Sequence, residues 1–263
     1  MNDWGIDVTR GADGVGWLTV RNPSRLNAIR REMWQALPGL LHDLAPDPAV
    51  RVVVMRGAGT EAFASGADIS EFETHRKDAA SAAAYERTTA LAFDAIGRFP
   101  KPLIAMISGV CVGGGLALAA SADLRVAAAD ARFALPAARL GLGYHFRGVE
   151  RLVQLVGPSA ACEIFFTARR YDAAEALRIG LVNQVVAAAD LEAYTIEYAA
   201  GVAANAPLTL RAAKSAILES LRDPAERDAA AVAASIAACF ESADYAEGVR
   251  AFLEKRPPRF RGA

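Results

Sequence analysis

Apolar and polar positions first form two short runs, residues 6–10 and 17–21, on either side of the turn-forming residues GADG. This pattern predicts a β-hairpin. An amphipathic stretch over 30–44 then predicts a helix, which Asp47 and Pro48 end before the apolar run RVVVMRG. The amino-terminal part is therefore predicted to form a ββα unit that leads into a buried strand.

The pattern recurs after a glycine-containing loop. Residues 81–98 predict a helix, Pro100 and Pro102 break it, and 104–107 predict a buried strand followed by a helix with glycines at its start. Further short strands are predicted at 124–128, 132–135 and 181–186, the last two being separated by a helical region. Strands and helices in alternation place the chain in the α/β class.

The last part of the chain consists almost entirely of helix-forming residues. From about 190 to 255, Ala, Leu, Glu and Arg recur at helical spacing, with interruptions at Pro207 and Pro224, so three helices are predicted. Alanine-rich runs such as DAAAVAASIAACF indicate closely packed helices. We therefore divide the chain into a strand-bearing core, 1–189, and a carboxy-terminal helical region, 190–263.

The uncharged segment 103–122 is about as long as a membrane span and contains a GxxxG spacing. Three consecutive glycines at 113–115 would break a lone helix, and Pro102 and Asp123 close its ends, so we predict no membrane span. The amino terminus, MNDWGIDVTR, lacks the basic and apolar regions of a signal peptide, so secretion is not expected.

Composition narrows the class of protein. The 263 residues are 53% hydrophobic and 22% charged, which suffices for one large domain or two small ones. With 29 basic and 30 acidic residues and a net charge of -1, nucleic acid is not an expected partner. Cys111, Cys162 and Cys239 lack metal-ligand spacing, so we expect packing roles, no metal site and a cytoplasmic location.

Two glycine-containing loops follow predicted strands. In FASGADI, Gly66 permits a sharp turn that would direct the N–H of Ala67 into a cleft; the alternative is an ordinary turn with Asp68 as a helix N-cap. In GVCVGGGLALA, the glycines let a ligand approach the main chain at a helix N-terminus; the alternative is tight packing of this helix on a strand. Neither loop matches a phosphate-binding motif. Two N–H groups that converge on one oxygen would instead form an oxyanion hole.

Five motifs in order resemble the crotonase superfamily, also called the enoyl-CoA hydratase/isomerase family. They are NPSRLNAI, FASGADISEF, ISGVCVGGGLALAASADLRVA, FTARRYDAAEALRIGLVNQVV and EGVRAFLEKRPPRF. The resemblance implies a crotonase-like spiral of ββα repeats with a carboxy-terminal helical trimerisation region, in a homotrimer or homohexamer. It also implies an acyl-CoA substrate and no permanently bound cofactor, because coenzyme A enters as part of the thioester.

The resemblance also assigns roles to residues. It places the two oxyanion donors at the backbone N–H groups of Ala67 and Gly114. It places coenzyme A contacts at Arg25, Leu26, Ser65, Asp68 and Ile69, and contacts to a neighbouring subunit's pocket at Phe252 and Lys255. The basic tail after Phe252 would meet coenzyme A phosphates or remain solvated.

One departure bears on the reaction. Hydratases of this family use two glutamates to activate water, and the matching positions here are Ala117 and Ala137, whose methyl groups carry no proton. Replacement groups are expected in the segment after Ala137, where Tyr144, His145 and Glu150 are candidates. Each also has a structural alternative: a partly buried aromatic, a loop histidine, and a carboxylate at a helix N-terminus.

Three functions stay open on these grounds. The first is a family enzyme that holds a thioester enolate at Ala67 and Gly114. The second is an (alkyl)malonyl-CoA decarboxylase, because Tyr144 matches a tyrosine of the methylmalonyl-CoA decarboxylase branch and departing carbon dioxide leaves an enolate directly. The third is a non-catalytic acyl-CoA binder that kept the pocket without the glutamates.

Overall fold

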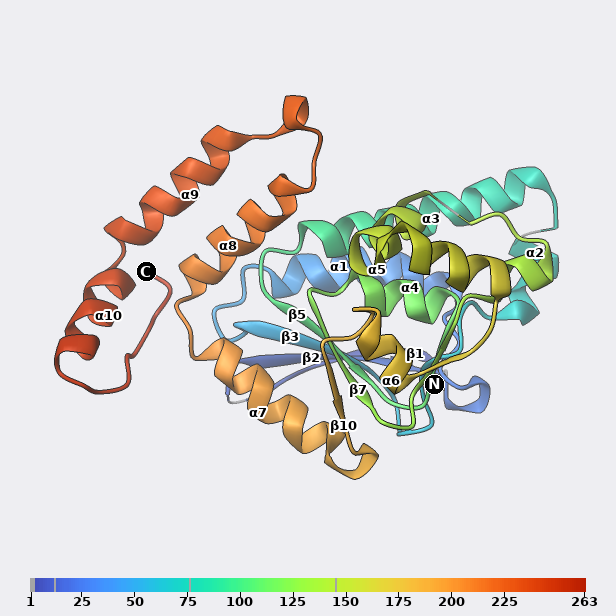
Figure 1. Cartoon of the computed structure of the whole chain (residues 1–263), viewed down its shortest axis with the longest axis horizontal. Coiled ribbons are helices and arrows are strands. Elements are labelled where there is room, and N and C mark those ends of the chain that lie inside the picture. The colour runs from blue at the N-terminus through green and yellow to red at the C-terminus, as the bar shows by residue number, and fades with distance from the viewer. Residues whose placement is uncertain (1–2, 12, 76, 145) are drawn as a thin grey trace.

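The computed structural model describes residues 3–11, 13–75, 77–144 and 146–263. A six-stranded sheet runs through its centre in the order β1-β2-β3-β5-β7-β10 (Figure 1). Its strands are β1 (Gly5–Arg10), β2 (Val15–Arg21), β3 (Val52–Gly57), β5 (Leu103–Ile107), β7 (Leu124–Ala128) and β10 (Gln184–Val186). The hairpin of β1 and β2 is antiparallel, as predicted, and the remaining pairs are parallel.

A second, four-stranded sheet has the order β4-β6-β8-β9. Its strands are β4 (Ala62–Ala64), β6 (Val110–Val112), β8 (Arg132–Ala134) and β9 (Tyr171–Asp172). After β3, β5 and β7 the chain passes in turn to β4, β6 and β8, and then to helices. This repetition is the spiral of ββα units expected from the resemblance, although of this sheet only β8 was predicted from the pattern.

Helices cover both faces of the large sheet (Figure 1). On one face lie α1 (Arg31–Leu44), α3 (Ala79–Arg98), α4 (Gly114–Ser121) and α5 (Phe146–Thr167), with the short α2 (Phe72–His75) beside them. On the other face lies α7 (Leu191–Ala203), whose Leu191, Ala199 and Ala203 pack on Val54 and Ile104. Because the central strands are buried on both faces, they consist of continuous apolar runs.

The carboxy-terminal helices extend away from the sheet (Figure 1). They are α8 (Pro207–Ser220), α9 (Ala229–Glu241) and α10 (Ala243–Leu253), so the region after 190 holds four helices where three were predicted. The additional break lies at Ser242, whose extended backbone ends α9 and whose hydroxyl accepts a hydrogen bond from Tyr245 N–H at 3.1 Å. The division of the chain into two regions at 189/190 stays a prediction. The helix α7, which follows this boundary, packs on the sheet, and α8, α9 and α10 project from it.

An ion pair joins α8 to the core. Lys214 Nζ lies 2.8 Å from Asp123 Oδ2 and also donates to the carbonyl of Lys101 at 3.0 Å. The same Asp123 oxygen accepts from Leu103 N–H at 2.8 Å, which links the end of α4 to the start of β5. Burial lowers the pKa of Lys214, although Asp123 opposes the shift. These contacts fix where the projecting helices leave the core.

The apolar segment 103–122 divides into β5, β6 and the eight-residue helix α4. In the part of the chain that the structure describes, no helix has the length and apolar character needed to cross a membrane.

Candidate active site

A cavity of about 150 Å³ lies where the two glycine-containing loops meet. Its walls come from α1, the loop 65–69, α3, the β6–α4 turn and the segment 135–144. Most of the lining is apolar, with Trp34, Phe93 and Leu135 among the larger side chains. The cavity therefore combines a largely apolar interior with exposed main chain at one wall.

In the loop 65–69, pairing with Ile29 leaves the backbone N–H of Ala67 without a partner on that segment. The N–H of Ile29 donates to Gly66 O at 2.7 Å, and the N–H of Asp68 donates to Ile29 O at 3.1 Å. Both hydrogen bonds flank Ala67, so the N–H of Ala67 itself is directed away from Ile29. Gly66 has φ +113°, a conformation that favours glycine and makes this turn possible.

The second loop uses each of its three glycines differently. Gly113 has φ +55°, and its N–H donates to Ala134 O at 2.9 Å. Gly114 is the first residue of α4, where an N–H has no acceptor within the helix. A Cβ on Gly115 would overlap the carbonyl oxygen of Ala64 and lie 2.7 Å from its Cβ. Gly115 therefore has the tight helix packing named as the alternative, whereas the role of the Gly114 N–H as a donor to a ligand stays a prediction.

The two donors lie side by side on the cavity wall. A Cβ built on Gly114 would lie 3.5 Å from the backbone nitrogen of Ala67, and both residues line the cavity. Among the described residues, no hydrogen bond connects either N–H to a protein acceptor. The wall thus presents two adjacent donors to whatever occupies the cavity.

Tyr144 stands against the same turn. Its hydroxyl donates to Gly113 O over a long 3.4 Å, and its ring meets the ring of Phe165 edge-on at 5.2 Å between centroids. The side chain is half-buried and lines the cavity, which fits both a role at the site and the structural alternative of a partly buried aromatic. The structure therefore brings Tyr144 together with Ala67 and Gly114.

Glu150, another candidate proton carrier, is not brought to this cavity. Glu150 is exposed on α5 and is not part of the described cavity lining, so the structure does not support its expected place at the site. Glu150 lies about one turn into α5, on a face of that helix that is exposed. His145 lies outside the described residues.

Ala117 and Ala137, which the resemblance matches to two glutamates of hydratases, are buried. Ala137 lines the cavity, and Ala117 lies within α4 behind its first turn. Neither position offers a polar atom beyond the backbone, so a proton carrier has to come from another wall.

Five residues expected to contact coenzyme A form one connected loop region. Ser65 and Ile69 line the cavity. Ser65 donates through its N–H to Leu26 O at 3.0 Å and through its hydroxyl to Arg25 O at 2.9 Å. Arg25 lies 3.4 Å from the buried Asp68 carboxylate, which accepts from Ser70 N–H as a helix cap. Asp68 thus has the capping role named as its alternative.

Phe252 and Lys255 lie far from this region. Phe252 is 83% exposed on α10, at the opposite end of the molecule from α2 (Figure 1). Lys255 follows α10 with φ +53°. Their expected role at a neighbouring subunit's pocket stays a prediction.

Sequence reasoning missed one wall of the cavity. Tyr85, Thr89 and Phe93 recur every fourth residue along α3, with Glu86 next to them, and all four line the cavity. Trp34 on α1 faces the same space. The four-residue spacing of these side chains indicates that they share one buried face of a helix. It does not indicate whether this face packs against other side chains or borders a cavity.

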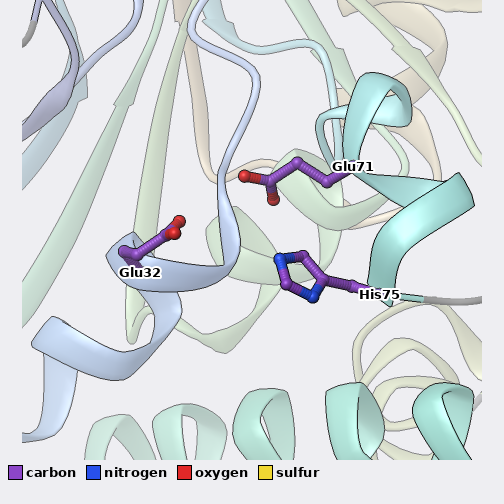
Figure 2. Close-up of side chains that lie close together, drawn as sticks. All are labelled: Glu32, Glu71 and His75. Atoms are coloured by element: carbon purple, nitrogen blue, oxygen red, sulfur yellow. The ribbon is translucent and has the colours of Figure 1, made fainter.

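A cluster of Glu32, Glu71 and His75 lies between the start of α1 and α2 (Figure 2). The buried Glu71 carboxylate accepts from Arg30 Nε at 2.7 Å and from Arg31 N–H at 2.9 Å. Two donors therefore already occupy its oxygens. We assign the cluster to holding the loop after Asp68 against α1, and assign no metal to it.

The cysteines differ in their surroundings. Burial raises the pKa of the Cys111 thiol, which lies on β6 within the core as expected of a packing residue. Cys239 is half-buried and donates to Ser235 O at 3.3 Å. Cys162 is exposed on α5, so its predicted packing role is wrong: the chain places it on the outer side of that helix.

Comparison with known proteins identifies the family of this chain. A sequence model of the enoyl-CoA hydratase/isomerase family matches residues 10–263. The short-chain-enoyl-CoA hydratase of Clostridium acetobutylicum is 33% identical over 242 residues, covering 92% of each chain. The methylmalonyl-CoA decarboxylase of Escherichia coli is 32% identical over 249 residues, covering 90% of this chain and 91% of its own.

A solved structure extends the likeness to three dimensions. An enoyl-CoA hydratase/carnithine racemase from Magnetospirillum magneticum superimposes with a TM-score of 0.92 at 36% identity, covering 100% of this chain and 97% of its own. The motifs, the ββα spiral and all three comparisons lead to one conclusion: the chain belongs to the enoyl-CoA hydratase/isomerase family of the crotonase superfamily.

Proposed function

We propose that the protein binds an acyl-CoA thioester in this cavity and catalyses a reaction that passes through the thioester enolate. The observation that carries the proposal is the pair of adjacent backbone donors at Ala67 and Gly114. An oxygen placed between them accepts two hydrogen bonds, and a thioester carbonyl is the group of an acyl-CoA that gains negative charge when an enolate forms. One such donor contributes about 2.7–4 kcal/mol to transition-state stabilisation.

The helix α4 adds to this effect. Gly114 is its first residue, so the positive end of the helix dipole faces the same oxygen. Because the donors are backbone groups fixed by the two loops, they need no reorganisation as charge develops. The apolar lining keeps water away from the oxygen and strengthens both hydrogen bonds.

The proton-transfer step needs a group other than the alanines. The phenol of Tyr144 borders the cavity beside Gly113, and we assign it the donation of a proton to the enolate carbon. A positioned general acid contributes about 10²–10⁴-fold to the rate. The proton would then be replaced from solvent.

Decarboxylation of an (alkyl)malonyl-CoA is the second candidate reaction, and Tyr144 is the observation that favours it. Loss of carbon dioxide generates the enolate without a base, so the reaction requires only the oxyanion donors and one proton donor. This matches a site with Ala117 and Ala137 in place of carboxylates. The likeness to a methylmalonyl-CoA decarboxylase is consistent with this candidate but not stronger than the likeness to hydratases.

Mass spectrometry of a mixed pool of enoyl-CoA, malonyl-CoA and alkylmalonyl-CoA thioesters tests these reactions together. Gain of water on an enoyl thioester establishes hydration, and loss of carbon dioxide establishes decarboxylation. A pool that stays intact while thioester is retained on the protein contradicts enzymatic activity and supports a non-catalytic binder. An intact pool with no retention contradicts the proposed function altogether.

We also propose that α8, α9 and α10 mediate a homotrimer or homohexamer. An apolar groove between these helices is lined by residues such as Ile236, Phe240 and Val249, and also by the highly exposed Phe252 and Leu253. Exposed apolar surface of this kind is typical of an interface. Light scattering after size-exclusion chromatography should give a trimer or hexamer for the wild type and a smaller species for Phe252→Asp; a monomeric wild type would contradict the assignment.

A further inference from the structure

A second cavity, of about 220 Å³, lies where the carboxy-terminal helices join the core, at the amino-terminal ends of β3 and β5. Among the described residues, it shares no lining residue with the candidate active site or with the apolar groove of α8 to α10. One water takes up about 30 Å³ in the liquid, so the cavity has room for several waters or for a polyatomic ion.

Proline forms much of the frame of this cavity. Five prolines line it, namely Pro46, Pro48, Pro100, Pro102 and Pro207. Each proline ring fixes φ near about −65°, so the chain around the cavity has little conformational freedom. A wall that is stiff before the ligand arrives lowers the entropic cost of binding.

The side chains around the cavity carry an excess of positive charge. Those with a charge are the cations Arg51, Lys101, Arg211 and Arg261 and the anion Asp47. The Asp47 carboxylate already accepts hydrogen bonds from Arg10 Nε at 2.6 Å and from Ala49 N–H at 2.9 Å. Because Asp47 is paired with Arg10, it does not offset the charge of the four cations.

Two of the cations are held in place by the main chain. Lys101 Nζ donates to Leu44 O at 2.8 Å and to Asp47 O at 2.7 Å. Arg51 donates to Phe260 O at 2.7 Å. An ammonium group has three hydrogens and a guanidinium group has five, so both side chains keep donors that these carbonyls do not use. Neutral carbonyls also leave the positive charge of both groups in place.

The other two cations have no partner among the described residues. Arg211 is exposed in the second turn of α8, and Arg261 is exposed in the segment after α10. No hydrogen bond or ion pair within the described chain reaches either guanidinium group. Burial lowers the pKa of Lys101, Asp47 opposes this shift, and the positive charge of Arg211 adds to it. The cations therefore lie close enough to repel one another, and an anion between them would remove this repulsion.

We propose that this cavity binds a phosphate group of a small anionic molecule, with Arg211 and Arg261 supplied by the carboxy-terminal region and Lys101 and Arg51 by the core. The planar fork of an arginine matches two phosphate oxygens, and a lysine adds a point charge. Phosphate carries more negative charge than a carboxylate and offsets more of the four cations. The bound anion fastens α8 and the tail to the ends of β3 and β5. This binding does not depend on the reaction proposed for the other cavity.

Titration calorimetry with inorganic phosphate and pyrophosphate tests the inference, with acetate at the same ionic strength as the reference anion. The wild type should bind pyrophosphate at one site per chain, bind phosphate less tightly, and show no saturable binding of acetate. Arg211→Gln and Arg261→Gln should each weaken the binding of pyrophosphate by about tenfold. Both residues are exposed and lack described partners, so these variants should fold as the wild type does.

Arg178→Gln is the matched control. Arg178 is exposed at the end of α6 (Ala173–Arg178), has no described partner, and is outside the lining of this cavity. Its replacement removes the same charge from the protein, so it should leave the affinity for pyrophosphate unchanged.

Thermal unfolding provides a second readout, because an anion that binds the folded state raises the unfolding temperature. Pyrophosphate, compared with acetate at the same ionic strength, should raise this temperature in the wild type and not in the double variant with both Arg211→Gln and Arg261→Gln. The inference is overturned if the wild type binds neither phosphate nor pyrophosphate, or if both single variants keep the wild-type affinity. An equal loss of affinity in Arg178→Gln also overturns it, since attraction by the overall charge would then explain the binding.

Discussion

Gly114 and Gly115 are neighbours in the chain, but the structure gives each a different reason to lack a side chain. A methyl group on Gly114 meets only ordinary contacts, 3.4 Å to Trp34 Cζ2 and 3.5 Å to Ala67 N, yet it would occupy the space in front of the Ala67 donor. A methyl group on Gly115 would overlap the backbone of Ala64 on β4. The two alanine variants should therefore separate catalysis from stability.

For Gly114→Ala we expect a folded protein that has lost activity. Gly114 is helical with an ordinary φ, so alanine should leave the free energy of unfolding unchanged or raise it by about 0.4–1 kcal/mol. Obstruction of one oxyanion donor should lower kcat by about 10²–10³-fold. For Gly115→Ala we expect a loss of about 1–3 kcal/mol in stability, because α4 has to move away from β4.

Thermal or urea unfolding measures the free energy of unfolding of each variant. Turnover of the thioester identified by mass spectrometry measures kcat. Gly201→Ala is the control: Gly201 is exposed in α7, remote from the cavity, and its Cβ would have no neighbour within 4 Å. This variant should gain up to about 1 kcal/mol in stability with unchanged kcat. Wild-type kcat in a folded Gly114→Ala protein would refute the assignment of the oxyanion donors.

Three further predictions follow from other contacts. Tyr144→Phe should lower kcat by about 10²-fold or more without changing the Kd of an unreactive thioester, and equal kcat values would exclude the phenol as proton donor. Lys214→Met should lower the free energy of unfolding by about 2 kcal/mol in urea titrations, because it leaves the Asp123 carboxylate without its charged partner; an unchanged midpoint would contradict this. Hydrogen bonds from Arg256 and Arg250 lower the pKa of Glu247 below the ordinary value of about 4.3. The ionised Glu247 therefore stabilises the fold above about pH 4.3, and this stabilisation is lost as the pH falls through the lowered pKa. Unfolding curves of the wild type and Glu247→Gln should accordingly differ at pH 7 and converge in acid, and a constant difference would refute the pairing.

Local patterns sufficed for most of the large sheet and its helices. The hairpin of β1 and β2, the helix α1 and the buried strands β3 and β5 lie within one or two residues of their predicted bounds, because apolar spacing and turn residues are local signals. The four-stranded sheet was largely missed. Its strands have two or three residues each, too few to show periodicity. The strand β6 also lies inside the glycine-rich motif GVCVGGGLALA, which was interpreted as a loop.

The candidate site shows the same division between local and non-local information. The amino-acid sequence alone determined that two glycine-containing loops exist and, through its motifs, which family the chain resembles; from that resemblance it predicted that Ala117 and Ala137 stand where hydratases have glutamates. Only the tertiary structure decided that Ala67 N–H and Gly114 N–H are neighbours, that Tyr144 borders them while Glu150 does not, and that Trp34 and one face of α3 complete the cavity. The physical reason is that spacing along a chain reports which face of an element is apolar, whereas the parallel pairing of β4 with β6, and the packing of α4 on β4, bring together residues almost fifty positions apart.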